Sequence, residues 1–168
     1  MFPQRARCGV ATTAALCVTD SRMKYDDASW HSGGNFPADS PPEYGATHIA
    51  LFLRWCFSKG WAGEMHRSEE PEDTQRVEGK FSAVEYFFQY CNGKLTNEDF
   101  DDTGNAFAEK YYGDDGLYLQ DYAEHFGDLM YLAPESAHDY SKFSLMLARR
   151  LETGVLTKQQ LKPWWKLW

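Results

Sequence analysis

Apolar residues recur at helical spacing along much of this chain. After Thr47, a suitable N-cap, Ile49, Phe52, Leu53 and Cys56 fall at positions i, i+3, i+4 and i+7. This spacing places their side chains on one face of a helix. It predicts a helix that begins at residue 47 and ends near residue 60.

Capping motifs mark the start of two further helices. Ser82 and Glu85 form a capping-box pattern ahead of an apolar stripe that ends at Cys91, and Asn92-Gly93 is the expected C-terminal stop. Thr96 and Asp99 form the same kind of capping pattern and predict a second helix after them. Gly104 makes one continuous helix there less favourable.

Two more helices are predicted towards the C-terminus. One carries the stripe Leu119, Tyr122, Ala123 and Phe126, and the other covers about residues 137–152. The stripe of the latter consists of Tyr140, Phe143, Leu147 and Leu151. No β alternation and no internal repeat is evident, so the fold class is mainly α.

The remaining segments are typical of turns and connections. Residues 23–46 are rich in Gly and Pro and predict a long turn-rich segment, pinned to the core by Trp30 and Phe36. Residues 61–80 are polar and predict a surface connection. We therefore expect a single compact helical domain over residues 23–168.

The first 22 residues differ in character from the rest. Two arginines precede a weakly apolar stretch, which is compatible with a secretory signal, but no convincing cleavage site follows. The favoured interpretation is an extension that lies ahead of a natural start at Met23. Residues 1–22 are expected to be poorly ordered.

Composition predicts a folded, soluble protein. Of its 168 residues, 43% are hydrophobic and 16% aromatic, which is more apolar material than disordered chains contain. No stretch reaches the roughly 20 apolar residues that cross a bilayer. The four cysteines show no CxxC spacing, which favours a reducing compartment and a cytoplasmic location.

Charge is concentrated in one region. The net charge is −8, and residues 95–128 hold ten acidic side chains against one lysine. This balance argues against nucleic acid as a partner, because phosphate contacts need clustered Lys and Arg. It favours a docking surface for a basic protein, which would steer association. The expected contacts are Asp101, Asp102, Asp114, Asp115, Asp121, Glu124 and Asp128, with Tyr118 as an aromatic anchor.

The centre of that surface is the helix over about residues 117–128. Asp121, Glu124, His125 and Asp128 are spaced i, i+3, i+4 and i+7, which the pattern places opposite the apolar stripe. An ordinary solvated face is the competing interpretation.

Metal and cofactor motifs are not evident, and none is predicted. Asp99, Asp101, Thr103 and Gly104 match early positions of an EF-hand loop, but Lys110 stands where a bidentate glutamate is required. No phosphate-binding, nucleophile-elbow or zinc-protease motif is present, so the protein is expected not to be an enzyme.

A second hypothesis is a small-ligand-binding protein or enzyme. Asp26, His31 and His48, with Trp30 and nearby glycines, could form a small polar pocket. Convergence of these side chains would favour this function, and separation would exclude it. A third hypothesis is a regulatory adaptor that binds through the aromatic tail at residues 163–168.

The run KYDDASWH at residues 24–31, followed by Gly33-Gly34, Phe36-Pro37 and GATHI at 45–49, resembles a family of small, uncharacterised bacterial proteins. GNAF at residues 104–107 and Tyr111-Tyr112 are similar to the later part of that family. The resemblance covers about residues 23–130. It implies no catalytic residues, and a loose association with interbacterial toxin systems favours an immunity role. The leading hypothesis is thus an immunity protein whose acidic surface occludes the cleft of a cognate toxin, expected to be a nuclease.

Overall fold

The computed structural model of the protein describes residues 23–34, 36–77, 82–130 and 137–161. The predictions for the leader and for the aromatic tail lie outside these residues. The described residues form seven α-helices and two short strands: β1 (Lys24–Asp27), α1 (Thr47–Ser58), α2 (Glu64–Glu69), α3 (Pro71–Val77), α4 (Ala83–Tyr90), β2 (Lys94–Thr96), α5 (Asp102–Tyr111), α6 (Tyr118–Phe126) and α7 (Ala137–Thr153). Short 3₁₀ helices complete it: η1 (Ala28–Trp30), η2 (Pro42–Ala46), η3 (Asn97–Asp99), η4 (Gly127–Leu129) and η5 (Lys158–Leu161). The prediction of a mainly α fold is confirmed.

Helix α1 is the centre of the core. Every residue from Thr47 to Phe57 is buried, on all sides of the helix and not only on the predicted stripe. A helix that is apolar all round is typically enclosed by other elements. Thr47 is the first residue of α1 rather than its cap, because η2 leads directly into the helix.

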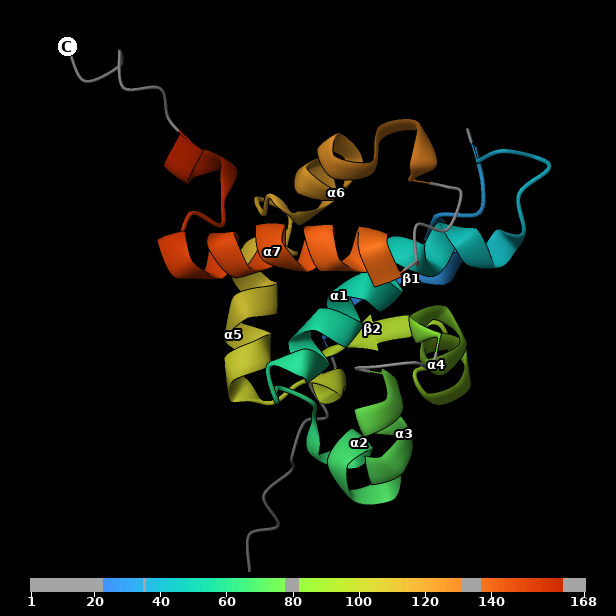
Figure 1. The fold of residues 1–168 in the computed structure, drawn as a ribbon, viewed down its shortest axis with the longest axis vertical. Coiled ribbons are helices and arrows are strands. Elements are labelled where there is room, and N and C mark those ends of the chain that lie inside the picture. The colour runs from blue at the N-terminus through green and yellow to red at the C-terminus, as the bar shows by residue number, and fades with distance from the viewer. Residues whose placement is uncertain (1–22, 35, 78–81, 131–136, 162–168) are drawn as a thin grey trace, which may run out of the picture.

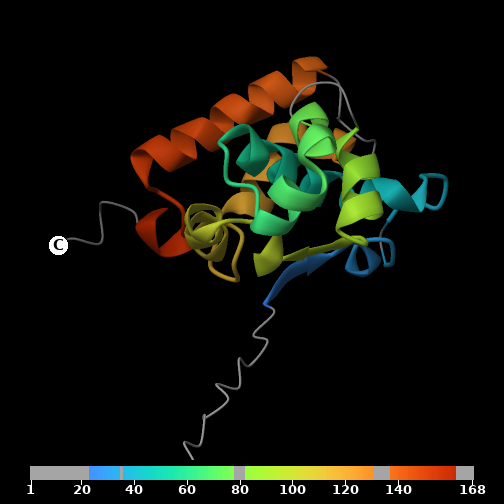
Figure 2. The same ribbon diagram turned by 90° about the horizontal axis from the view of Figure 1, so that it is seen from below.

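The other elements surround α1 (Figure 1). Helix α7 crosses one side of it with α6 beyond, α5 and α4 flank it, and α2 and α3 lie together at its far end. Figure 2 shows the β1–β2 pair on the side of the molecule away from α7. The segment from β1 to η2 therefore packs on the same hydrophobic core as α5 and α6.

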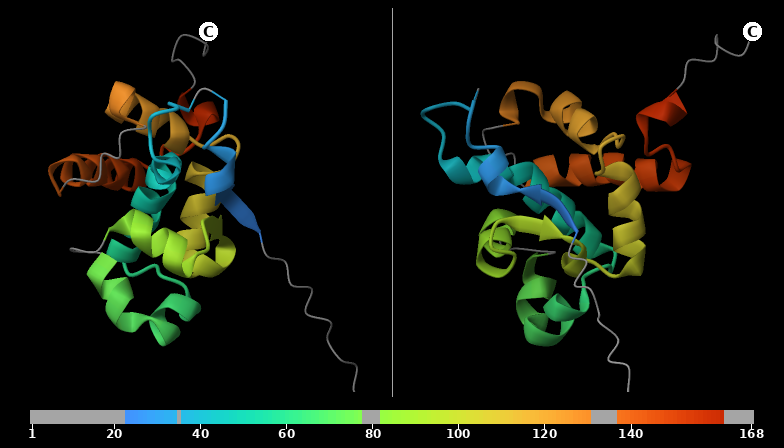
Figure 3. Two further views of the ribbon diagram at one scale, coloured as in Figure 1. Left: turned by 90° about the vertical axis from the view of Figure 1, so that its right-hand side faces the viewer. Right: turned by 180° about the vertical axis from the view of Figure 1, so that it is seen from behind.

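The two strands differ from the sequence prediction, which contains none. They pair antiparallel, with Asp26 opposite Leu95 and Asp27 opposite Lys94, and the register shifts between Lys24 and Asp26. Figure 3 shows β1 crossing the back of the molecule beside β2. Strands of three and four residues are too short to show a period-two pattern in the sequence.

Residues 64–77 also differ from the prediction, since they form α2 and α3 instead of a plain surface connection. His66, Thr74 and Val77 are buried there against the core. These three residues form the buried face of the two short helices. That face is hard to recognise in the sequence because most of the surrounding residues are charged.

Helix α5 continues through Gly104 without interruption. A Cβ at that position would lie 2.9 Å from Phe100 Cβ and 3.1 Å from Trp61 Cβ. The glycine therefore serves close packing of the first turn of α5, which offsets its poor helix propensity.

Helix α6 is rotated relative to the predicted stripe. Its buried residues are Tyr118, Asp121, Tyr122 and Phe126, whereas Leu119 is 48% exposed. The reason is that Asp121 has partners in the interior, described below. Among the described residues, no helix is both long and apolar enough to cross a membrane.

Candidate functional site

Three protonatable side chains, two from nearby histidines and one from a tyrosine far along the chain, converge on the carboxylate of Asp26. His31 Nε2 lies 2.6 Å from Asp26 Oδ1, and His48 Nε2 lies 3.3 Å from Oδ2. The Tyr112 hydroxyl donates a hydrogen bond to Oδ2. These four residues form what we call the Asp26 cluster. The convergence that the second hypothesis requires is therefore present.

Strand β1 holds the Asp26 carboxylate in the interior. Asp26 and Asp27 are consecutive and both are buried, whereas a regular strand would turn one of them outward. Asp27 caps η1 through Ser29 N and Oγ and pairs with Lys24 at 2.9 Å. Asp26 Oδ1 accepts a hydrogen bond of 2.7 Å from Asp27 N, and the carboxylate faces the two histidines.

The 3₁₀ helices η1 and η2 place the two histidines beside the Asp26 carboxylate. His31 ends η1, which carries the chain back over Asp26, and His48 is the second residue of α1. A Cβ at Gly45 would lie 3.0 Å from the His31 carbonyl oxygen, so the glycine lets η2 close against η1. The two imidazole rings meet edge-on with centroids 4.3 Å apart.

Burial and hydrogen bonding set the protonation of the cluster. Burial alone would raise the pKa of Asp26, but the hydrogen bonds from His31, His48 and Tyr112 outweigh it and hold that pKa well below its usual range. Burial lowers the pKa of His48 and raises that of the Tyr112 phenol. The cluster therefore contains a carboxylate, a neutral His48 and a neutral Tyr112.

Tyr112 belongs to this site although no local motif indicates it. It follows α5, 86 residues after Asp26, and its ring stacks on Tyr118 at 4.6 Å. The Tyr118 hydroxyl donates in turn to the His48 carbonyl. Aromatic packing thus holds the back of the cluster rigid.

The front of the cluster opens into a cavity of about 330 Å³. Asp26, His31 and Tyr112 line it, and 26% of the His31 side chain is exposed. Trp30 stands at its edge, 60% exposed, with the Lys24 ammonium 4.3 Å from the ring centroid. The remaining lining residues are Tyr25, Gly113, Asp114, Gly116, Leu119, Gln120 and Lys158.

A larger groove of about 1240 Å³ lies between η2 and α4. Pro41, Val84 and Phe88 give it apolar walls, while its charged residues are Glu43 and Glu85. Among the described residues that line it there is no histidine and no buried carboxylate. The smaller cavity is the better candidate site, because perturbed ionisable groups in a cleft are typical of functional sites.

The predicted acidic surface is only partly assembled. Five of its carboxylates are exposed, namely those of Asp102, Asp114, Asp115, Glu124 and Asp128. Asp102 begins α5 and Asp114 follows its end, which separates them by a helix about 15 Å long. Asp101 is half-buried, caps α5 through Gly104 N and lies 3.8 Å from Arg67.

Two of the predicted contacts, Tyr118 and Asp121, lie in the interior and not on the predicted surface. Tyr118 is fully buried and cannot anchor a partner. Asp121 is 7% exposed and forms a bidentate pair with Arg150, with both distances 2.7 Å. Tyr111 donates a further hydrogen bond of 2.6 Å to it. These donors offset the cost of burying the Asp121 charge.

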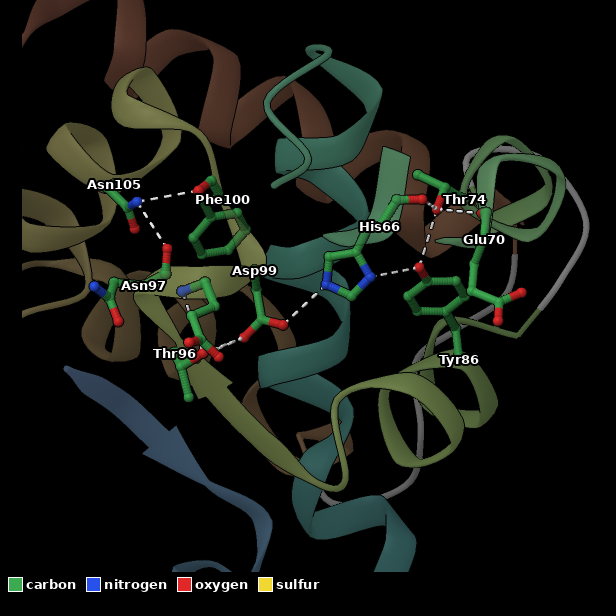
Figure 4. A network of polar contacts seen from close by, with 10 residues as sticks. His66, Glu70, Thr74, Tyr86, Thr96, Asn97, Asp99, Phe100 and Asn105 are labelled. Atoms are coloured by element: carbon green, nitrogen blue, oxygen red, sulfur yellow. Dashed lines mark hydrogen bonds and ion pairs between the residues drawn. The ribbon is translucent and has the colours of Figure 1, made fainter. Parts of the chain in front are cut away.

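A second buried group with metal-ligating side chains, the His66 cluster, consists of His66, Cys91 and Asp99. Figure 4 shows His66 between Asp99 and Tyr86. His66 Nε2 is 2.9 Å from Asp99 Oδ1, and its Nδ1 is 2.8 Å from the Tyr86 hydroxyl. The other Asp99 oxygen accepts from Thr96 N, and burial keeps the pKa of Cys91 well above its usual value. These contacts are those of a satisfied hydrogen-bond network, and the cluster lines neither cavity described above.

Comparison with known proteins identifies a family but no activity. A family described as "Domain of unknown function (DUF7832)" matches residues 24–138. The match contains β1 to α6 and therefore every residue of the Asp26 cluster. No curated protein and no solved structure matches the chain.

Proposed function

The chain belongs to this family of domains of unknown function, and from the geometry of its site we propose that it binds a small polar ligand in the cavity above Asp26. The observation that supports this most is the convergence of His31, His48 and Tyr112 on one buried carboxylate at the base of that cavity. Buried ionic groups stabilise proteins poorly compared with apolar packing, so fold stability alone does not account for the cluster.

The lining indicates the class of ligand. A cavity of about 330 Å³ is at the small end of ligand-binding sites. Trp30 offers an aromatic face, while His31, Gln120 and Lys158 offer hydrogen-bonding groups around it. This combination suits a compact molecule with one flat or apolar side and several polar atoms.

The proposal is tested by NMR with a panel of small carboxylates, monosaccharides and nucleosides as probes. We expect a binding probe to shift the Trp30 indole N–H, the Gln120 side-chain amide and the amides of Gly113 and Gly116. Gln120→Leu should weaken that binding, whereas Gln89→Leu, which alters the larger groove, should leave it unchanged.

The opposite result would overturn the proposal. If no probe binds, or if the shifts cluster around Gln89 and Phe88 and respond to Gln89→Leu, the cavity above Asp26 is not a ligand site.

Toxin neutralisation is a second candidate. The exposed carboxylates of Asp114, Asp115, Glu124 and Asp128 favour it, since they could approach a basic partner. The partner would be a cognate toxin, and this role requires no catalysis.

Replacing these four carboxylates together with lysine should abolish capture of a basic partner from the native cell at low salt. A matched variant with four charge reversals at Glu64, Glu69, Glu72 and Glu85 should retain it. Equal capture by both variants would show that the acidic surface does not bind the partner.

A further inference from the structure

We propose that Asp26, His31 and His48 form a binding site for a divalent transition metal ion of the zinc class, open towards the cavity. The inference rests on the proposed function, because it assigns the chemistry at the base of the same cavity. Its support is the donor set, the spacing of the donor atoms, and the groups behind them.

The donor set is two imidazoles and one carboxylate. Their ligand atoms all lie within 4.8 Å of one another. Two histidines and an acidic residue are a recurrent ligand set for zinc with an open position, and for non-haem iron. Calcium and magnesium prefer all-oxygen sites, so this site should discriminate against them.

The spacing suits one shared ion. Ligands at metal–donor distances of about 2.0–2.2 Å stand roughly 3–3.5 Å apart in tetrahedral or octahedral geometry. The observed separations are 2.6 Å from His31 Nε2 to Asp26 Oδ1 and 3.3 Å from His48 Nε2 to Asp26 Oδ2, so the ion would lie between the two imidazoles and either one or both carboxylate oxygens. His31, which is partly exposed at the cavity, needs to move back by less than about 1 Å.

The groups around the three donors resemble those that orient the ligands of a metal site. The backbone of Gly45 hydrogen-bonds the His48 ring, and Nε2 of that ring faces Asp26, which leaves Nδ1 for Gly45. Neutral His48 carries a single N–H. A metal ion on Nε2 would place that N–H on Nδ1, where metal-bound histidines commonly donate to a carbonyl. The Tyr112 hydroxyl stands beside the carboxylate as a neutral donor that orients it.

The exposed side of the cluster explains how an ion could also contact a ligand. Asp26 and His31 line the cavity, whereas His48 lies behind them. An ion on these three donors would keep its open positions towards the cavity. It would attract ligands with carboxylate or other oxygen donors.

The experiment is calorimetric titration of the full, metal-stripped chain with ZnCl₂, in parallel with Co²⁺ absorption spectroscopy. We expect one Zn²⁺ per chain, visible Co²⁺ bands and no response to Mg²⁺. His31→Ala should weaken Zn²⁺ binding by about 100-fold, because it removes one of the three ligands, and circular dichroism checks that the variant is folded.

Controls separate this site from other cysteine and histidine groups. Cys91→Ser alters the His66 cluster and His138→Ala removes an exposed histidine, and both should bind Zn²⁺ as the wild type does. Asp26→Asn provides a second test of the ligand set once circular dichroism shows that it is folded.

Absence of Zn²⁺ binding to the wild type would overturn the inference, as would binding that survives His31→Ala or disappears in Cys91→Ser. The NMR panel is run on metal-free and Zn²⁺-loaded protein. Probe binding without any Zn²⁺ affinity would leave the proposed ligand site standing and remove the metal. Zn²⁺ binding without probe binding, in both the metal-free and the Zn²⁺-loaded protein, would support the metal site and overturn the proposed ligand site.

Discussion

The contribution of a charged side chain to the stability of this protein depends on whether it is buried with a partner or exposed. Asp121 and Glu124 are three residues apart on α6, yet Asp121 is buried with Arg150 and Tyr111 while Glu124 is exposed. Removing one member of a buried ion pair leaves the other charge unpaired in the interior. Exposed carboxylates carry no such penalty.

Because Arg150 is 24% exposed and stays partly solvated, Asp121→Asn should lower the free energy of unfolding by about 1–3 kcal/mol, through the weakened hydrogen bonds of the buried side chain. Glu124→Gln, the matched control on the same helix, should change it by less than about 0.5 kcal/mol. Urea denaturation followed by circular dichroism measures both. Similar small effects from the two substitutions would contradict the burial of Asp121.

The same residue shows where reasoning from the sequence fails. Periodicity assigns charged side chains to the outer face, and it places Asp121 there with Glu124 and Asp128. The partner of Asp121, Arg150, lies 29 residues further along the chain. Nothing local to α6 encodes that pairing, so only the tertiary structure corrects the prediction.

At the level of elements, local signals are informative. Ser82 accepts a hydrogen bond from Glu85 N at the start of α4, and Thr96 and Asp99 form a complete capping box at η3. Helix α7 ends at Thr153, before Gly154 in the left-handed conformation. These motifs are short-range, and their hydrogen bonds need no knowledge of the rest of the fold.

Long-range proximity explains the unexpected glycine in α5. Gly104→Ala should lower the free energy of unfolding by about 1–3 kcal/mol despite the better helix propensity of alanine, because the new methyl meets Phe100 and Trp61. Gly33→Ala has nothing within 4 Å and should be close to neutral. Thermal unfolding of both variants tests this, and a stabilised Gly104→Ala protein would refute the close packing.

The His66 network connects α2 with η3 and α4. His66→Ala would leave the buried Asp99 carboxylate without its imidazole partner, and we expect a loss of about 3–5 kcal/mol in unfolding free energy. His138→Ala, an exposed histidine on α7, should change it by less than about 0.5 kcal/mol. Urea midpoints distinguish the two, and a near-neutral His66→Ala would mean that the network contributes little to the fold.

For the molecule as a whole, the Asp26 cluster joins β1, η1, α1 and the end of α5. Asp26, His31 and His48 can be singled out from the sequence, because they lie close together in the first third of the chain. Tyr112 cannot, because it reaches the cluster from 86 residues away. The cavity itself depends on the loop after α5 and on Lys158, which no pattern places near Trp30.

An ion bound at this junction should stabilise the entire fold. At a Zn²⁺ concentration of 100 times the dissociation constant, the gain in unfolding free energy is about 2.7 kcal/mol. We expect this rise in the urea midpoint for the wild type and for Cys91→Ser, but not for His31→Ala. An equal rise in His31→Ala would place the ion elsewhere.

The most direct measurement is a crystal structure of the protein grown with Zn²⁺, with anomalous diffraction recorded at the zinc edge. We expect a single strong peak about 2.0–2.2 Å from an Asp26 carboxylate oxygen, His31 Nε2 and His48 Nε2, with its open side towards Trp30. A map with no peak there, in which His31 and His48 remain hydrogen-bonded directly to Asp26, would contradict it.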